Sequence, residues 1–135
     1  MAGYSGTPLA KKLGLKDGFR AGFVNPPKGF DQDLGKLPAN VEISRETLRK
    51  PLDLIVLFAN SQQMLKREFP RLARKLAVNG MLWIAWPKKS SGVITDLSDN
   101  SVREIGLAAG LVDVKVCAVN NIWSGLKFVY RLKDR

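Results

Sequence analysis

The sequence predicts an α/β protein with an open, mostly parallel sheet, helices on both faces of the sheet, and a C-terminal antiparallel hairpin. Two apolar runs, LDLIVLFA (Leu52 to Ala59) and MLWIAW (Met81 to Trp86), have the continuous hydrophobicity of strands that are buried on both faces. The stretch between them carries apolar residues at helical spacing, and alternation of strands with helices is typical of a parallel sheet. A length of 135 residues predicts a single domain that spans residues 1–135.

The first third of the chain is divided by prolines and glycines. Thr7 followed by Pro8 is typical of a helix start, and Gly14 of a helix end. The expected elements are a short helix from Thr7 to Leu13, a strand from Phe19 to Val24, a loop from Asn25 to Gly29, one or two helical turns from Phe30 to Leu37, and a short strand around Val41 and Ile43.

The rest of the chain alternates helices with apolar strands. Asn60 and Ser61 cap a long helix, in which Pro70 is expected to produce a kink or a restart and which Asn79-Gly80 ends. The apolar face of this helix is expected to hold Leu65, Phe69, Leu72 and Leu76. A second helix follows near Ser101 to Ala109, and two strands, Val112 to Val119 and Leu126 to Leu132, form a hairpin through NNIWSG.

The composition excludes several kinds of chemistry. Histidine is absent and Cys117 is the single cysteine, so Ser-His and Cys-His triads and zinc sites of ordinary type are excluded. We expect Cys117 to be a buried, reduced thiol in a cytoplasmic protein, and the sequence shows neither a signal peptide nor a membrane span. The net charge of +10 favours anionic partners.

Two resemblances support this fold. LDLIVLFA, AVNGMLWIAWP and AAGLVDVKV resemble the second half of the Rossmann-like methyltransferases, over Leu52 to Arg135. The whole chain, including YSGTPLAKKLG and GFVNPPKGF, resembles a family of small bacterial proteins classed as a domain of unknown function. The resemblances imply a compact Rossmann-like fold and no established activity.

The turn after the first strand differs from a methyltransferase cofactor loop. The methyltransferases place glycines there, whereas this chain has Asn25-Pro26-Pro27-Lys28-Gly29, and its two prolines remove two amide donors. Glu42 or Glu46 is a candidate carboxylate for ribose hydroxyls, with a solvated surface residue as the alternative. We count six strands where a full methyltransferase core has seven, and we expect no bound cofactor and no metal.

Polar loops follow three of the predicted parallel strands. The carboxyl ends of such strands form the ligand edge of an open α/β sheet, and no acidic residue is expected at this edge. Asn60 and Ser61 also begin a helix, whose free amides favour an anion. The candidate ligand-binding residues are Asn25, Lys28, Gly29, Asn60, Ser61, Lys88, Lys89, Ser90 and Ser91, with Lys28 expected beside Lys88 and Lys89. Ordinary solvated loops are the alternative interpretation.

A basic stripe on the long helix supports a second hypothesis. Arg67, Arg71, Arg74 and Lys75 fall on one side of it, so they either form a solvated face or contact nucleic acid or an acidic protein. Trp83 and Trp86 are expected in the core, while Trp123 is either exposed or packed over the sheet edge.

Three functional classes remain open at this point. The main hypothesis is a non-catalytic protein that binds a small anionic or nucleotide-like ligand at the carboxyl edge of the sheet. The alternatives are a basic module that binds nucleic acid or an acidic protein, and a reduced S-adenosylmethionine-dependent methyltransferase. The sequence determines neither the ligand nor the oligomeric state.

Overall fold

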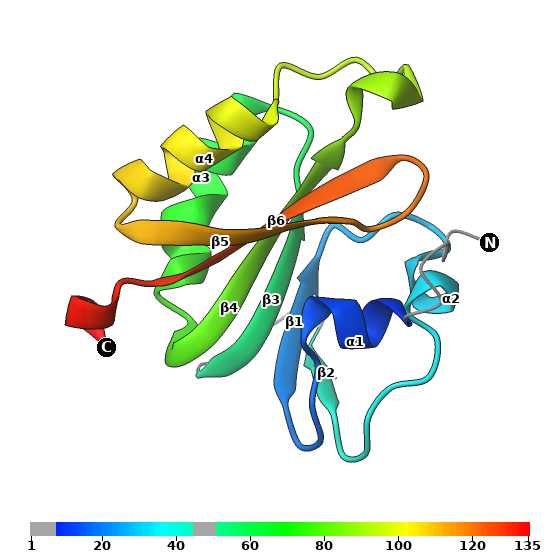
Figure 1. The fold of residues 1–135 in the computed structure, drawn as a ribbon, viewed down its shortest axis with the longest axis vertical. Coiled ribbons are helices and arrows are strands. Elements are labelled where there is room, and N and C mark those ends of the chain that lie inside the picture. Colours follow the sequence, from blue (N-terminus) through cyan, green and yellow to red (C-terminus); the bar gives the residue numbers. More distant parts are fainter. Residues whose placement is uncertain (1–7, 45–50) are drawn as a thin grey trace.

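The computed structural model describes residues 8–44 and 51–135, and within these ranges six strands form one sheet in the order β2-β1-β3-β4-β6-β5 (Figure 1). The strands are β1 (Arg20–Val24), β2 (Glu42–Ser44), β3 (Leu52–Phe58), β4 (Leu76–Pro87), β5 (Leu111–Ala118) and β6 (Trp123–Tyr130). β2, β1, β3 and β4 pair in parallel, and β6 is antiparallel to both β4 and β5. The predicted α/β fold with its C-terminal hairpin is confirmed.

Helices cover both faces of this sheet. They are α1 (Leu9–Leu13), α2 (Phe30–Leu34), α3 (Gln62–Ala73) and α4 (Asp99–Ala108), together with the short 3-10 turns η1 (Lys89–Ser91) and η2 (Leu132–Asp134). Successive side chains of β3 point to opposite faces, so Val56 packs with α1 and α2 whereas Ile55 packs with α3 and α4. The continuous apolar run in β3 therefore supplies two separate cores.

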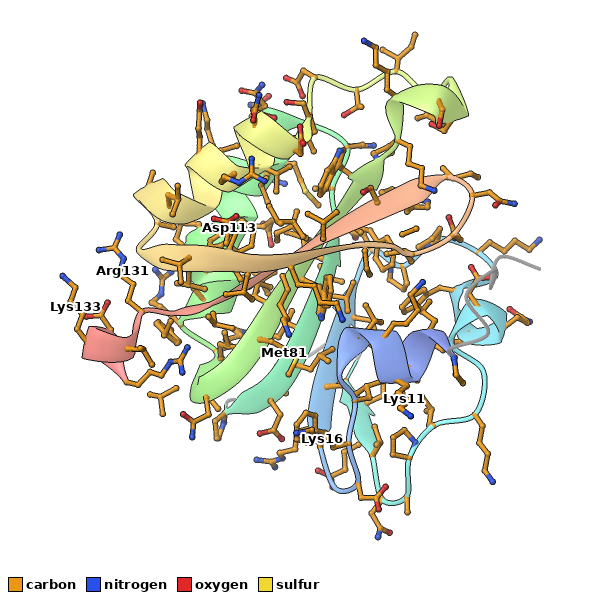
Figure 2. The ribbon with its side chains drawn as sticks, in the orientation of Figure 1. Lys11, Lys16, Met81, Asp113, Arg131 and Lys133 are labelled. Carbon is orange, nitrogen blue, oxygen red and sulfur yellow. The ribbon has the colours of Figure 1, made fainter. Side chains whose placement is uncertain are left out.

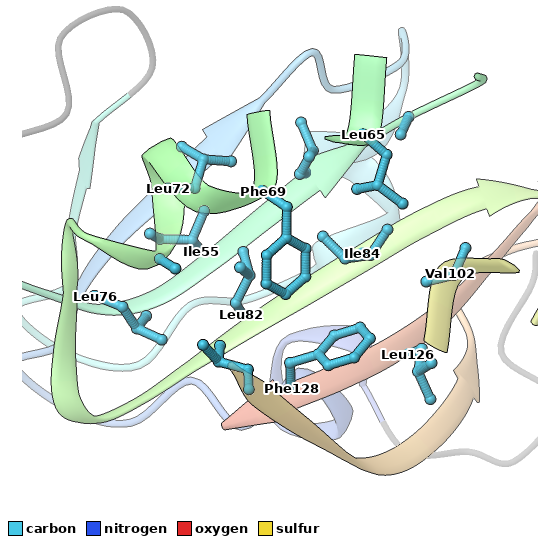
Figure 3. Close-up of a cluster of buried hydrophobic side chains, with 14 of the residues drawn as sticks. Ile55, Leu65, Phe69, Leu72, Leu76, Leu82, Ile84, Val102, Leu126 and Phe128 are labelled. Carbon is cyan, nitrogen blue, oxygen red and sulfur yellow. The ribbon is translucent and has the colours of Figure 1, made fainter. Parts of the chain in front are cut away.

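The core under α3 and α4 is closed by aromatic packing (Figure 3). Phe69 of α3 meets Phe128 of β6 edge to face, with ring centroids 5.1 Å apart. α4 approaches the same ring at Gly106, where an added Cβ would lie 2.1 Å from Phe128. Tyr130 donates its hydroxyl hydrogen bond to the carbonyl of Ala73, which ends α3. These contacts fix both helices against the hairpin.

The long helix is shorter than the sequence predicts. α3 is one helix that includes Pro70 and ends at Ala73, and Leu76, which was expected on its apolar face, begins β4 instead. The backbone leaves the helix here because the amide of Leu52 bonds the carbonyl of Lys75 (2.9 Å) and draws the chain into the sheet. Gly80 lies within β4, where a Cβ would meet the Leu52 carbonyl at 2.9 Å, so it permits a close approach and does not end a helix.

The other helix boundaries are close to those predicted. Gly14 ends α1 with φ of 94°, as expected for a C-terminal glycine, whereas Thr7 lies outside the described residues. α2 ends at Leu34, before Gly35, so the expected turns up to Leu37 are not all helical. Ser98 and Ser101 form a capping box that starts α4. Among the described residues, no helix is long and apolar enough to cross a bilayer.

Candidate ligand site at the carboxyl edge of the sheet

The strand order reverses between β1 and β3. From β1 the chain continues to β2 on one side and then returns to β3 on the other, and ligands of open α/β sheets bind where the strand order reverses in this way. Asn25 follows β1 and Asn60 follows β3, and both side chains are exposed. Both residues therefore flank this reversal point.

The turn after β1 combines rigid and permissive positions. Asn25 (φ 56°) and Gly29 (φ 92°) have left-handed backbones, and between them the carbonyl of Pro27 accepts the amide of Phe30 (3.1 Å). Nothing lies within 4 Å of the position that a Cβ of Gly29 would take, so the backbone there is open to a ligand. Pro26 and Pro27 contribute no amide donors, so this turn does not form a glycine-type anion cradle.

A row of aromatic rings lies beneath this edge. Phe23 contacts Phe30 at 5.1 Å between centroids, Phe30 contacts Phe58 at 4.9 Å, and Phe58 contacts Trp123 at 5.1 Å, all edge to face. Phe30 and Phe58 are almost fully buried, so they fill the space between the sheet and α2. Trp123 is half-buried over the sheet edge, while Trp83 and Trp86 lie in the core as predicted.

The helix start at Asn60 and Ser61 already has acceptors within the protein. Ser61 Oγ accepts the amide of Met64 (3.2 Å), and Asp96 Oδ1 accepts the amide of Gln62 (2.8 Å). The Gln62 side chain also donates to the carbonyl of Asp96 (2.8 Å). The expectation of an edge without acidic residues is therefore wrong, because the loop before α4 folds back and places Asp96 on the helix start.

A second acidic residue lies on the other side of the same edge. Asp33 of α2 accepts a hydrogen bond from the side chain of Asn120 in the hairpin turn (2.9 Å). Asp33 and Asp96 are distant in sequence from the residues that they bond. The sequence pattern around them therefore predicts neither contact.

The lysines of the predicted site occupy separate segments. Lys88 is held by a backbone bond from its amide to the carbonyl of Ile122 (2.7 Å), and Ser91 Oγ donates to the Lys88 carbonyl (2.6 Å). Lys89, Ser90 and Ser91 form η1, which lies well away from α2 in Figure 1. Lys28 precedes α2, and its expected position beside Lys88 and Lys89 stays a prediction.

Glu42, one of the two glutamates considered for ribose binding, does not lie at the carboxyl end of β2. Glu42 is the first residue of β2, at its amino end, where its carboxylate pairs with Arg20 (3.3 Å). The sequence of this short strand does not indicate at which end of the strand Glu42 lies. Glu46 lies outside the described residues. Among the described residues, no three His, Cys, Asp or Glu side chains are grouped as a metal site would require.

The basic stripe of α3 contains an acidic residue. Glu68 accepts from Arg67 Nε (3.1 Å) and from the guanidinium of Arg71, and these hydrogen bonds, that of Arg71 foremost, lower the pKa of its carboxyl group. Arg74 is the C-terminal cap of the helix, and Lys75 follows it. Two of the four cations in the predicted stripe are thus partnered by a carboxylate beside them.

Hollows lined by described residues occur away from the carboxyl edge. One of about 560 Å³ lies beside α1 and is lined by Lys11, Lys16 and Lys36 among others, and one of about 370 Å³ lies between α3 and α4. Neither includes Asn25, Asn60 or the η1 residues.

Comparison with known proteins shows the same architecture in methyltransferases. No protein-family model matches the chain, and no curated protein matches it either. A S-adenosylmethionine-dependent methyltransferase from Aquifex aeolicus has a TM-score of 0.58 at 18% identity, with 87% of this chain and 85% of that one covered. The ribosomal protein L11 methylase of Lactobacillus delbrueckii subsp. bulgaricus has a TM-score of 0.62 at 12% identity, with 91% and 75% covered.

A third neighbour is considerably longer than this chain. PigF with SAH has a TM-score of 0.61 at 7% identity, and the match covers 84% of this chain but only 56% of PigF. At these identities the likeness shows the fold, which is that of the Rossmann-like methyltransferases.

Proposed function

We propose that this protein binds an adenosyl ligand of the S-adenosylmethionine type at the carboxyl edge between β1 and β3, as a reduced relative of the methyltransferases. One observation carries the proposal: the strand order places the reversal point between β1 and β3, in a fold whose solved neighbours include S-adenosylmethionine-dependent methyltransferases. The open space at Gly29 and the exposed amides of Asn25 and Asn60 support it, since a nucleoside needs close backbone approach and hydrogen-bonding groups.

The site fits such a ligand only in part, which limits the proposal to binding. Pro26 and Pro27 replace the amide donors of a glycine turn, and Glu42, one of the two glutamates considered for the ribose, lies at the wrong end of β2. The Phe30 and Phe58 rings pack against each other and form a floor beneath these strand ends. A ligand therefore rests on this aromatic floor and contacts Asn25, Gly29 and Asn60, and no methyl-transfer step follows from the described residues.

Calorimetry tests this proposal with S-adenosylmethionine, S-adenosylhomocysteine and adenosine as titrants. We expect a Kd of about 1 to 100 μM for the first two, which corresponds to roughly −8 to −5 kcal/mol. Gly29→Ala should weaken binding at least tenfold because its methyl group enters the open space. Gly110→Ala is the matched control, since Gly110 also has a positive φ and free space but lies at the end of α4, away from the edge. Titrations of the native chain that give no binding heat would refute the proposal.

A second candidate is a small oxyanion held near η1, favoured by the exposed Lys89 and Ser90 and by the net charge of +10. Thermal melting in phosphate or sulfate, compared with chloride at equal ionic strength, separates it from the first. A specific gain for the native chain that Lys88→Ala with Lys89→Ala abolishes would support the oxyanion. Equal shifts in both proteins would dismiss it.

A further inference from the structure

Four lysines gather on the face of the sheet that carries α1, at β5 and β6. Lys127 of β6 pairs with Trp83 of β4 on one side and with Lys115 of β5 on the other. Because cross-strand partners point to the same face, the ammonium groups of Lys115 and Lys127 emerge side by side. Lys127 Nζ lies 5.9 Å from the centre of the Trp83 ring, which locates this lysine on the α1 face.

α1 and the turn after it add the other two lysines, and the position of α1 is fixed. Trp83 Nε1 donates to the carbonyl of Leu13 (2.8 Å), and Met81 packs against Gly14, where a Cβ would lie 2.9 Å from the Met81 sulfur. Lys12 Nζ then donates to the carbonyl of Ala118 at the end of β5 (3.3 Å). Lys16 follows two residues after Gly14, and Figure 2 shows it below α1, on the side of Met81.

The cations that act on Lys127 are other lysines. Burial, followed by repulsion from Lys115, lowers the pKa of Lys127, and Lys16 acts in the same direction. The described carboxylate on β5, Asp113, faces α4 on the opposite side of the sheet, where Arg103 Nε binds it (2.9 Å). The protein thus keeps a repulsive group of cations together on one face.

We propose that this face, defined by Lys12, Lys16, Lys115 and Lys127 and called here the lysine face, binds the phosphate backbone of nucleic acid. Charge complementarity identifies the partner, because four cations gathered on one face attract a polyanion. The same charge opposes a second copy of this chain. Asp17, which follows Lys16, accepts the backbone amide of Ala39 (3.1 Å). Lys16 and Lys115 are exposed on separate elements, so the four lysines are spread over a surface that suits an extended chain more than an enclosed metabolite.

This surface is better suited to phosphate than the basic stripe of α3. In that stripe Glu68 binds two of the arginines, whereas on the lysine face the interactions that shift the pKa of Lys127 come from Lys115, Lys16 and Cys117. Trp83 is fully buried and offers no ring for base stacking. Binding through the lysine face is therefore expected to be independent of sequence and strongly dependent on salt.

Fluorescence anisotropy with a labelled 20-nucleotide single strand of mixed sequence tests the proposal. The native chain should bind at about 50 mM salt, and its log K should fall linearly with log salt. The triple variant Lys16→Gln, Lys115→Gln, Lys127→Gln should bind at least tenfold more weakly, with a salt slope lower by about two, since each phosphate contact on a single strand contributes about 0.7. The control Arg67→Gln with Arg71→Gln changes two charges on the other face and should bind as the native chain does.

Several outcomes would overturn the proposal. They are no binding by the native chain at low salt, equal loss in the control and the triple variant, or equal affinity for poly-glutamate or anionic lipid vesicles. Removing the repulsive lysines should leave the melting temperature unchanged or raise it, so lost binding is separable from lost folding. If the triple variant fails to fold, Lys115→Gln alone gives the same comparison. Adenosyl binding at the carboxyl edge is measured independently and does not decide this result.

Discussion

At the scale of single residues, Lys127 shows a conflict between packing and charge. Its stem packs beside Trp83, but its ammonium group is half-buried and faces Lys115, so burial and then repulsion lower its pKa. A ring 5.9 Å away lies near the limit of about 6 Å for a cation–π attraction, so this attraction offsets little of the cost.

Lys127→Met should therefore stabilise the protein by up to about 1 kcal/mol at pH 7, since the apolar stem is retained and a like-charge pair is removed. In the native state the pKa of Lys127 lies below its value in the unfolded chain, so the charged ammonium group destabilises the fold. This destabilisation is fully present at neutral pH and disappears as the pH rises through the native pKa toward the unfolded value. Urea unfolding at pH 7 and above pH 10 should show the gain of the variant shrinking with pH. A constant or growing gain would contradict the repulsion.

Cys117 is the second residue whose behaviour follows from its surroundings. Burial raises the pKa of its thiol, and the nearby lysines, Lys12 first, oppose this shift without cancelling it. Because the thiolate is the reactive form, the native protein at pH 8 should react with a disulfide reagent at least tenfold more slowly than the urea-unfolded chain. Equal rates would mean that the hairpin opens readily.

At the scale of elements, α4 depends on one glycine. Gly106 lies against the fully buried Phe128 ring, and an added methyl group would overlap it at 2.1 Å. Phe128 is held in turn by Phe69, so the ring has little room to move.

Gly106→Ala should lower the free energy of unfolding by about 1 to 3 kcal/mol, because the added methyl group overpacks the core. This loss outweighs the gain of about 1 kcal/mol that alanine brings as the better helix former. Glu104→Ala, at an exposed position of the same helix, is the control and should change stability by no more than about 0.5 kcal/mol. Chemical denaturation measures both. A Gly106→Ala variant as stable as the control would show that α4 can shift away from β6.

At the scale of the whole molecule, the two cores share the same strands. β3 and β4 contribute side chains to both faces, so loss of one core removes packing from the strands that hold the other. We expect the described residues to behave as one cooperative unit, which accords with the single domain predicted from length.

Phe30→Leu, in the core under α1 and α2, and Phe69→Leu, in the core under α3 and α4, should each lower the melting temperature of one common transition. Tryptophan fluorescence reports on both cores, because Trp83 and Trp123 belong to or pack against the first core and Trp86 belongs to the second. Far-ultraviolet circular dichroism reports on the helices. The two signals should coincide in both variants. Separated transitions would show that the two faces unfold independently.

The sequence by itself determined the fold class and most of the elements, because buried strands and capped helices leave local patterns. LDLIVLFA predicts a strand covered on both faces, and Gly14 predicts the end of α1, since each depends on neighbouring residues only. The tertiary structure decided what depends on contacts between distant residues. It placed Asp96 on the start of α3, Glu42 at the amino end of β2, and Leu76 in a strand that the Leu52 amide draws into the sheet. It also brought Lys12 and Lys16 to the face that carries Lys115 and Lys127, because Trp83 fixes the end of α1 through a hydrogen bond that spans seventy positions of the chain.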